Sequence, residues 1–140
     1  GTSGATFYVT GVQLEKGSAT DFEYVDYSQQ LQMCQRYYET SYSSGVVPGA
    51  ANNVGCPYGI IPVTTSNYNF YYSYQVAKRA SSTMVAYSAI TGAINKIYVN
   101  GADVSFFNFE RVGTYGWQLT SNSVTAGNNY QFQWTASAEF

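Results

Sequence analysis

Hydrophobic and polar residues alternate along much of this chain, most clearly in its closing segment, residues 130–137. Four residues fall on one side of an extended strand, Tyr130, Phe132, Trp134 and Ala136, and four on the other, Gln131, Gln133, Thr135 and Ser137. A period of two with one apolar face is typical of a strand. One buried and one wetter face further indicate an antiparallel sheet.

Turn-forming residues divide the chain before this segment into further short strands. Strands are expected at residues 59–65, 70–77, 83–88, 94–99, 104–109 and 117–121, with residues 66–69 as a turn. Asn100-Gly101 is the strongest hairpin signal, because both residues tolerate a positive φ. About seven short strands with turns about every eight to twelve residues predict an antiparallel β-sandwich, jelly-roll-like in type.

The N-terminal part reads differently. Residues 7–14 carry a strand pattern, and residues 28–40 are expected to form one short helix with Ser28 as its N-cap. Within that helix an apolar stripe is formed by Leu31, Cys34, Tyr37 and Tyr38. We expect Leu31, Cys34 and Tyr38 to face a packing partner and not solvent.

Residues 41–57 are rich in Gly, Pro, Asn and Ser and carry no strand pattern. This loop is long for a connection within one compact domain. It therefore either has a binding function or packs against a neighbouring part of the structure.

The composition favours a recognition surface. The 140 residues include fifteen Tyr, whereas only 10% are charged. Tyrosine provides a large contact area with few torsions to freeze, although preference for Tyr in β-sheets accounts for more than half of the enrichment. A net charge of −2 with no basic cluster beyond Lys78-Arg79 argues against nucleic acid as a partner. No apolar run approaches the roughly 20 residues of a membrane-spanning helix.

Catalytic signals are missing from the sequence. The chain has no His, which excludes Ser-His and Cys-His nucleophile pairs and His-based metal sites. Its eight carboxylates are scattered, and Cys34 and Cys56 are expected to be free thiols, with Cys34 buried on the helix stripe. We expect no catalytic residue, no metal site and no cofactor.

Two segments resemble a known family. Residues 13–38 read QLEKGSATDFEYVDYSQQLQMCQRYY, and residues 78–83 read KRASST. Both are similar to segments near the C-terminus of tail-fibre and receptor-binding proteins of tailed phages, as is the ending Ala-Glu-Phe. Asp21 and Ser82 stand where the family usually has proline, so the turn before Phe22 is expected to be built differently from the family's.

The resemblance implies a receptor-binding tip at the end of a tail fibre, located in the virion and assembled in the host cytoplasm. Residues 1–27 would bring the chain from the fibre shaft, and residues 28–140 would form the domain with its leading helix. The implied assembly is a homotrimer, and the ligand a host glycan or an outer-membrane protein, bound without enzymatic activity. The alternative is a structural trimerisation tip, or a carbohydrate-binding module of a tailspike depolymerase whose catalytic part lies upstream.

Candidate ligand residues follow from the turns. A fibre tip meets its receptor at the end away from the shaft, and the turns richest in Tyr, Asn and Gly lie at residues 66–69, 100–103 and 113–117. From these we select Tyr68, Asn69, Tyr115 and Trp117 as ligand-binding residues, with a core position as the alternative for Trp117. Within the aromatic cluster, Phe70, Tyr72 and Tyr74 share one strand face and Tyr71 the other, and either face could be the exposed one.

Overall fold

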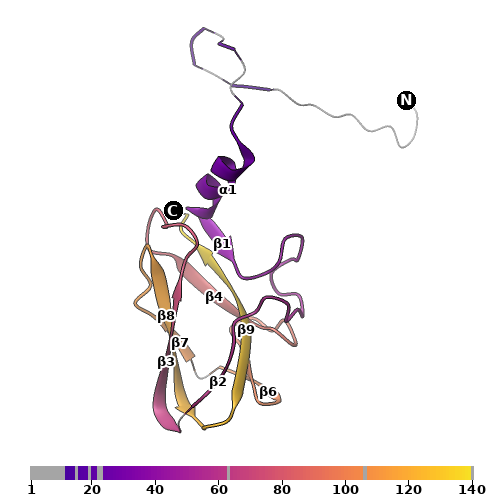
Figure 1. Cartoon of the computed structure of the whole chain (residues 1–140), viewed down its shortest axis with the longest axis vertical. Coiled ribbons are helices and arrows are strands. Elements are labelled where there is room, and N and C mark those ends of the chain that lie inside the picture. The colour runs from indigo at the N-terminus through magenta and orange to yellow at the C-terminus, as the bar shows by residue number, and fades with distance from the viewer. Residues whose placement is uncertain are drawn as a thin grey trace, which may run out of the picture.

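The computed structural model describes residues 12–14, 16–18, 20–21, 24–62, 64–105 and 107–139, and only the backbone of residues 65–67 and 122–124. Most of the strand expected at residues 7–14 lies outside these residues, and residues 12–14 are not part of a strand; Phe22 also lies outside them. Within them the elements are helix α1 (Tyr27–Gln35) and strands β1 (Tyr38–Thr40), β2 (Tyr58–Ile60), β3 (Thr65–Ser73), β4 (Thr83–Ser88), β5 (Ile97–Val99), β6 (Ala102–Val104), β7 (Phe107–Glu110), β8 (Gly116–Val124) and β9 (Asn129–Ser137) (Figure 1).

Strand β9 is the centre of a six-stranded antiparallel sheet. Strands β1 and β2 pair with one of its edges, and β4 and β5 pair with the other, while β6 extends the sheet beyond β5. Trp134 O accepts from the Ser41 N–H, and the Phe132 N–H donates to Pro57 O, which places β1 and β2 on the same edge. The loop of residues 41–57 therefore leaves this edge and returns to it.

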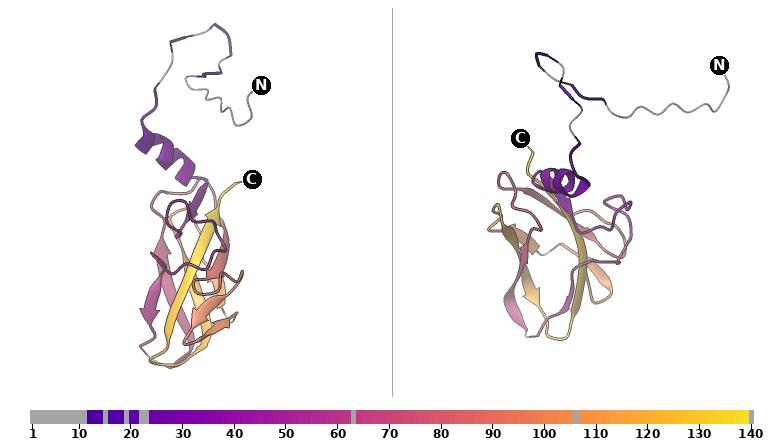
Figure 2. Two further views of the ribbon diagram at one scale, coloured as in Figure 1. Left: turned by 90° about the vertical axis from the view of Figure 1, so that its right-hand side faces the viewer. Right: turned by 45° about the horizontal axis from the view of Figure 1, so that its top comes forward.

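The second sheet has three antiparallel strands in the order β3-β8-β7. Strand β3 pairs with β8 from Thr65↔Val124 to Ser73↔Gly116, and β7 pairs with the other edge of β8. The two sheets face each other, and α1 lies at one end of them (Figure 2).

The core fills the space between the sheets. The ring of Trp117 on β8 lies 5.4 Å from that of Trp134 and 6.3 Å from that of Phe132, both on β9. Eleven buried residues form this cluster: Ile61, Phe70, Tyr74, Ala86, Ile97, Val99, Trp117, Leu119, Phe132, Trp134 and Ala136. The chain is thus mainly β, with antiparallel sheets in a sandwich-like arrangement and one short helix, as the sequence predicts.

The bounds predicted for individual strands are correct in some places and wrong in others. The β4 bounds are as predicted, and Asn100-Gly101 joins β5 to β6 with positive φ at both residues, 44° and 101°. The turn predicted at residues 66–69 is wrong, because these residues belong to β3 and pair along β8. The strand predicted at residues 104–109 is two strands, since β6 belongs to one sheet and β7 to the other.

The helix also differs from expectation. It begins at Tyr27 with Asp26 as N-cap, not Ser28, because the Asp26 carboxylate accepts from the Ser28 N–H at 2.8 Å. The hydrogen bonds from Ser28 lower the pKa of Asp26. The helix ends at Gln35, not at residue 40, because residues 38–40 pair with β9 as strand β1.

The helix stripe does not pack on the sheet of its own chain. No residue of α1 is buried; Leu31 is 42% exposed, and Cys34 is exposed as well. The expectation of a buried Cys34 thiol is therefore wrong for the single chain. The sandwich closes its core without the helix, which leaves the stripe uncovered in this chain.

The polar face of β9, which alternation predicts to be solvent-exposed, is partly covered by other residues of the chain. Gln133 is fully buried and Thr135 nearly so. The Gln133 amide donates to the carbonyls of Asn52 and Val54, at 2.9 Å and 3.2 Å, and accepts from the Ser41 hydroxyl at 2.5 Å. The loop of residues 41–57 thus packs against the chain's own sheet.

Candidate ligand-binding surfaces

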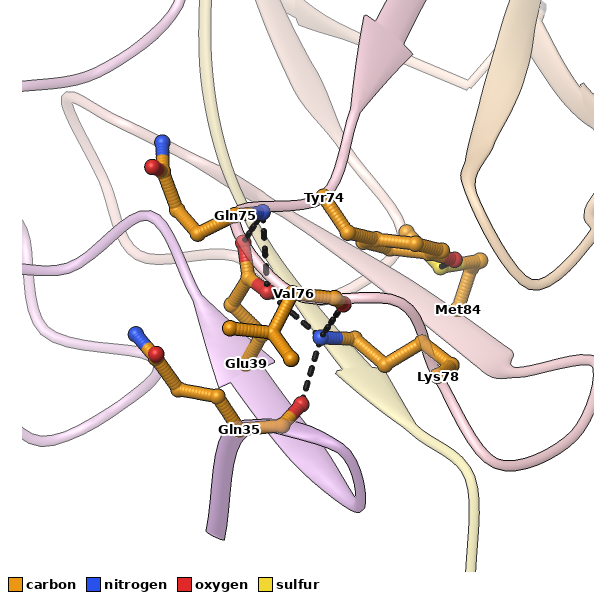
Figure 3. Close-up of polar contacts among 7 residues, drawn as sticks. All are labelled: Gln35, Glu39, Tyr74, Gln75, Val76, Lys78 and Met84. Carbon is orange, nitrogen blue, oxygen red and sulfur yellow. Dashed lines mark hydrogen bonds and ion pairs between the residues drawn. The ribbon is translucent and has the colours of Figure 1, made fainter. Parts of the chain in front are cut away.

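A buried ion pair forms the joint between α1 and the sandwich. Lys78 Nζ donates to Glu39 Oε2 and to the Gln35 carbonyl, each at 2.5 Å (Figure 3). Glu39 also accepts from the N–H of Gln75, and Lys78 Nζ lies 4.6 Å from the centre of the Tyr74 ring. Because both charges are shielded and have partners, this cluster is suited to holding the structure together and not to binding a ligand.

Residues from both resemblance motifs meet at this joint. Arg79 donates its N–H to the Arg36 carbonyl at 3.0 Å, and its guanidinium lies 5.1 Å from the centre of the Tyr37 ring. Ala138 donates its N–H to the Tyr37 carbonyl at 2.7 Å. The residues following the helix are therefore fixed to the end of the sandwich by main-chain bonds as well as by Lys78.

Two open grooves of about 420 Å³ each lie beside β1 and share Gln35, Glu39 and Thr40. The more polar groove extends toward the mouth between the sheets, where its lining includes Cys56, Tyr72, Ser73, Gln75 and Trp134. Burial raises the pKa of the Cys56 thiol. The more apolar groove runs along the helix stripe and is lined by Tyr27, Leu31, Cys34, Tyr38, Tyr42 and Ser44.

Tyr115 is exposed and lies in a turn at the α1 end of the sandwich. Its side chain is 78% exposed in the turn between β7 and β8. Its carbonyl accepts from the Tyr74 N–H, and the neighbouring Thr114 carbonyl accepts from the Lys78 N–H. The turn therefore belongs to the end of the sandwich where α1 is attached, not to the opposite end.

Tyr68 and Asn69 lie within β3 and not on a loop. The half-buried Tyr68 directs its ring toward the core side, 4.8 Å from the ring of Phe70. Asn69 points to the opposite face, is exposed and pairs with Thr120 of β8. The side chains of Tyr68 and Asn69 thus lie on opposite faces of the same sheet.

Trp117 is a core residue. It is 3% exposed and stacks on Tyr72, with ring centres 4.5 Å apart and an angle of 26° between the planes. Its burial removes it from the ligand surface and favours the core alternative. The structure therefore does not bring the four selected residues together.

The exposed aromatic of the cluster is Tyr71, at 67% exposure, whereas Phe70 and Tyr74 are buried and Tyr72 is half-buried. The register places Tyr71 opposite Gln118, which in turn lies opposite Glu110; Asn69, Thr120 and Asn108 form the adjacent row. We call these six residues the outer-face grid. The alternation of Trp117 and Leu119 with Gln118 and Thr120 is the sequence signal that could have pointed to it.

Three of the carboxylates outside the grid have structural partners. Asp26 caps the helix, Glu39 pairs with Lys78, and Asp103 accepts from the Thr91 hydroxyl at 2.5 Å. Among the described residues, no group of three or more Cys, Asp or Glu side chains could hold a metal ion.

No helix in the described part of the chain is both long and apolar enough to cross a membrane.

Comparison with known proteins adds no further assignment: no family model, curated protein or solved structure matches the chain.

Proposed function

We propose that this chain is the receptor-binding tip of a tailed-phage tail fibre, that it forms a homotrimer in the virion, and that it acts by binding and not by catalysis. The sequence support is the resemblance of residues 13–38 and 78–83 to the family's junction segments. The structural support is that these segments meet at one end of the sandwich, where Lys78 holds the end of α1.

The observation that carries the proposal is the uncovered helix. Residues 24–26 lead into α1 from the side away from the sandwich (Figures 1 and 2). The helix has nine residues and buries none of them in its own chain. A helix of this length is marginal in water without tertiary packing. Symmetry mates that cover the helix face with Tyr27, Leu31 and Cys34 would supply that packing, as expected where a threefold shaft joins its tip.

This arrangement leaves the flanks and far end of each sandwich for a host glycan or an outer-membrane protein. Three copies in one tip, and several tips in one virion, would multiply a weak affinity for each site. Low charge and many Tyr and Asn side chains suit such a surface, because they combine contact area with hydrogen-bonding capacity.

The alternative assignment is a carbohydrate-binding module of a depolymerase whose catalytic part lies elsewhere. The partners of Glu39 and Asp103 fit it too, because they engage these carboxylates in structural contacts. Release of reducing ends from host polysaccharide by this chain alone would contradict both assignments.

The test is a binding assay on whole cells. The full chain, fluorescently labelled, is incubated with a panel of bacterial strains, and its mass is measured by light scattering. We expect trimer mass, saturable binding to a subset of strains and no release of reducing ends. A monomer that binds none of a broad panel would refute the proposal.

A further inference from the structure

The outer face of the three-stranded sheet has the chemistry of a sugar-binding platform. Six residues on three adjacent strands point to this face: Asn69, Tyr71, Asn108, Glu110, Gln118 and Thr120. Their strand neighbours Phe70, Leu119 and Phe109 point into the core or pack against it. Directly opposite residues in such a sheet lie about 5 Å apart at Cβ. In each row the residues of β3 and β7 are exposed, and the β8 residue between them, Gln118 or Thr120, is buried.

One polar atom in this grid lacks a partner. Gln118 is 3% exposed, and its amide donates to the Thr120 hydroxyl at 2.8 Å. Its Oε1 atom is buried and accepts no hydrogen bond from any described residue. Buried polar atoms normally have a partner, and leaving one unpaired has a free-energy cost. A ligand hydroxyl that donates to this oxygen would remove that cost.

The neighbours of Gln118 determine how a ligand would reach it. Tyr71 and Glu110 lie directly opposite Gln118 on its two sides, and both are exposed. Exposed side chains change rotamer within picoseconds to nanoseconds. A ligand on the grid would reach Gln118 Oε1 only where such a rearrangement exposes it.

The charge and chemistry of the grid select the ligand class. Glu110 is its one charged residue, so the surface is anionic and has no cation to pair with an acidic sugar. Tyr71 supplies an aromatic face for sugar C–H groups, while Asn69 and Asn108 supply amides for hydroxyls. We propose that the outer-face grid binds neutral oligosaccharides, with Tyr71 as the stacking residue and Gln118 as a buried acceptor. This proposal rests on the proposed receptor-binding function and specifies its ligand.

The test uses the full chain on an array of neutral hexose and N-acetylhexosamine oligosaccharides, printed beside counterparts carrying uronate or phosphate. Wild-type protein should bind neutral members. Tyr71→Ala should weaken that binding by about tenfold, because truncating an aromatic anchor commonly costs about 1.4 kcal/mol or more. Tyr58→Ala is the matched control, since Tyr58 is a 57% exposed strand tyrosine on the other sheet; it should bind as wild type does.

A second variant, Gln118→Met, keeps the side chain's length but removes its acceptor, together with the amide that donates to Thr120. It should also lose binding by about tenfold while retaining the wild-type near-ultraviolet circular dichroism spectrum. If this variant fails to fold, the exposed Tyr71→Ala variant still tests whether the grid binds the sugar.

The remaining outcomes are separable. Cell binding without any neutral-glycan signal, or a signal that Tyr71→Ala does not reduce, overturns the grid but leaves receptor binding intact. Preference for acidic members overturns the neutral assignment. Wild-type protein that binds neither cells nor the array overturns the proposed function and this site with it.

Discussion

Lys78 Nζ lies 2.5 Å from Glu39 Oε2, and the two side chains are only 0% and 7% exposed. Glu39 comes from β1 and Lys78 from the segment after β3, so the pair joins the two sheets at the helix end. A buried pair adds little net stability, but removal of one partner leaves an uncompensated buried charge.

Lys78→Met should therefore lower the free energy of unfolding by about 3–5 kcal/mol. The double variant Lys78→Met/Glu39→Gln should lose less than the sum of the two single variants, because it removes both charges. Urea denaturation measures these values, and Lys16→Met at an exposed position is the control. If the loss in the double variant equalled the sum of the two single losses, Lys78 and Glu39 would not be energetically coupled.

Tyrosines that pack against the core predict alkaline instability. Tyr72 packs against Trp117 and Phe132, and burial raises the pKa of its hydroxyl, with Tyr130 as a second cause. A raised folded-state pKa means that the fold holds this proton more tightly than the unfolded chain does. Its contribution is complete below the unfolded pKa of about 10 and is lost as the pH rises toward the folded-state value.

The melting temperature should thus fall steeply above about pH 10, with each such tyrosine contributing about 1.4 kcal/mol per pH unit. Tyr72→Phe should make the decline shallower, whereas Tyr71→Phe at an exposed position should not. An equal slope in all three proteins would contradict the assignment to Tyr72.

Gly92, in the turn after β4, allows a close approach of the loop of residues 41–57. Its φ is +75°, and a Cβ atom there would lie 2.1 Å from the Gly49 carbonyl oxygen. Gly127, at φ +83°, has nothing within 4 Å of such an atom and is the matched control. Gly127→Ala should cost about 1–2 kcal/mol from backbone strain alone.

Gly92→Ala should cost more than Gly127→Ala and should detach the loop of residues 41–57. Thermal unfolding measures the first effect, and the rate of limited proteolysis within the loop measures the second. If both variants lost the same stability and loop cleavage were unchanged, the close contact between Gly92 and Gly49 would not be needed to hold the loop.

The helix stripe predicts a variant that separates assembly from folding. Leu31 is 42% exposed in the single chain, so Leu31→Asp should change the stability of the sandwich by less than about 0.5 kcal/mol. In the proposed trimer the same aspartate would be buried, and the mass in light scattering should fall to that of the monomer. Met33→Asp, on the other side of the helix, should retain trimer mass. Retained trimer mass in both variants would place the interface elsewhere.

Local signals in the sequence predict local features of this fold. Asn100-Gly101 specifies its hairpin because its backbone conformation is intrinsic to those residues. Residues 66–69 carry an equally polar turn signal, but they extend as part of β3 because pairing along β8 outweighs it. The burial of Gln133 depends on a loop that returns over β9 and has no local signature.

The candidate site was less predictable than the fold. Trp117 lies in the core or on the surface according to which face of its strand points inward. Alternation in the sequence does not distinguish these two positions. The end at which Tyr115 lies depends on strand connectivity, which pairs distant segments such as Tyr72 and Trp117. The outer-face grid combines three strands, so its rows exist only once the register is known.

The central place of β9 has a consequence for how the chain folds. It follows all four of its partner strands in the sequence, so β1, β2, β4 and β5 have no common partner until synthesis has passed residue 129. Pairings this distant in sequence close slowly, and their unpaired edges are prone to aggregate while they wait. We expect a ribosome-bound chain stalled before residue 129 to be digested readily by protease, and resistance to appear in a single step once β9 has emerged.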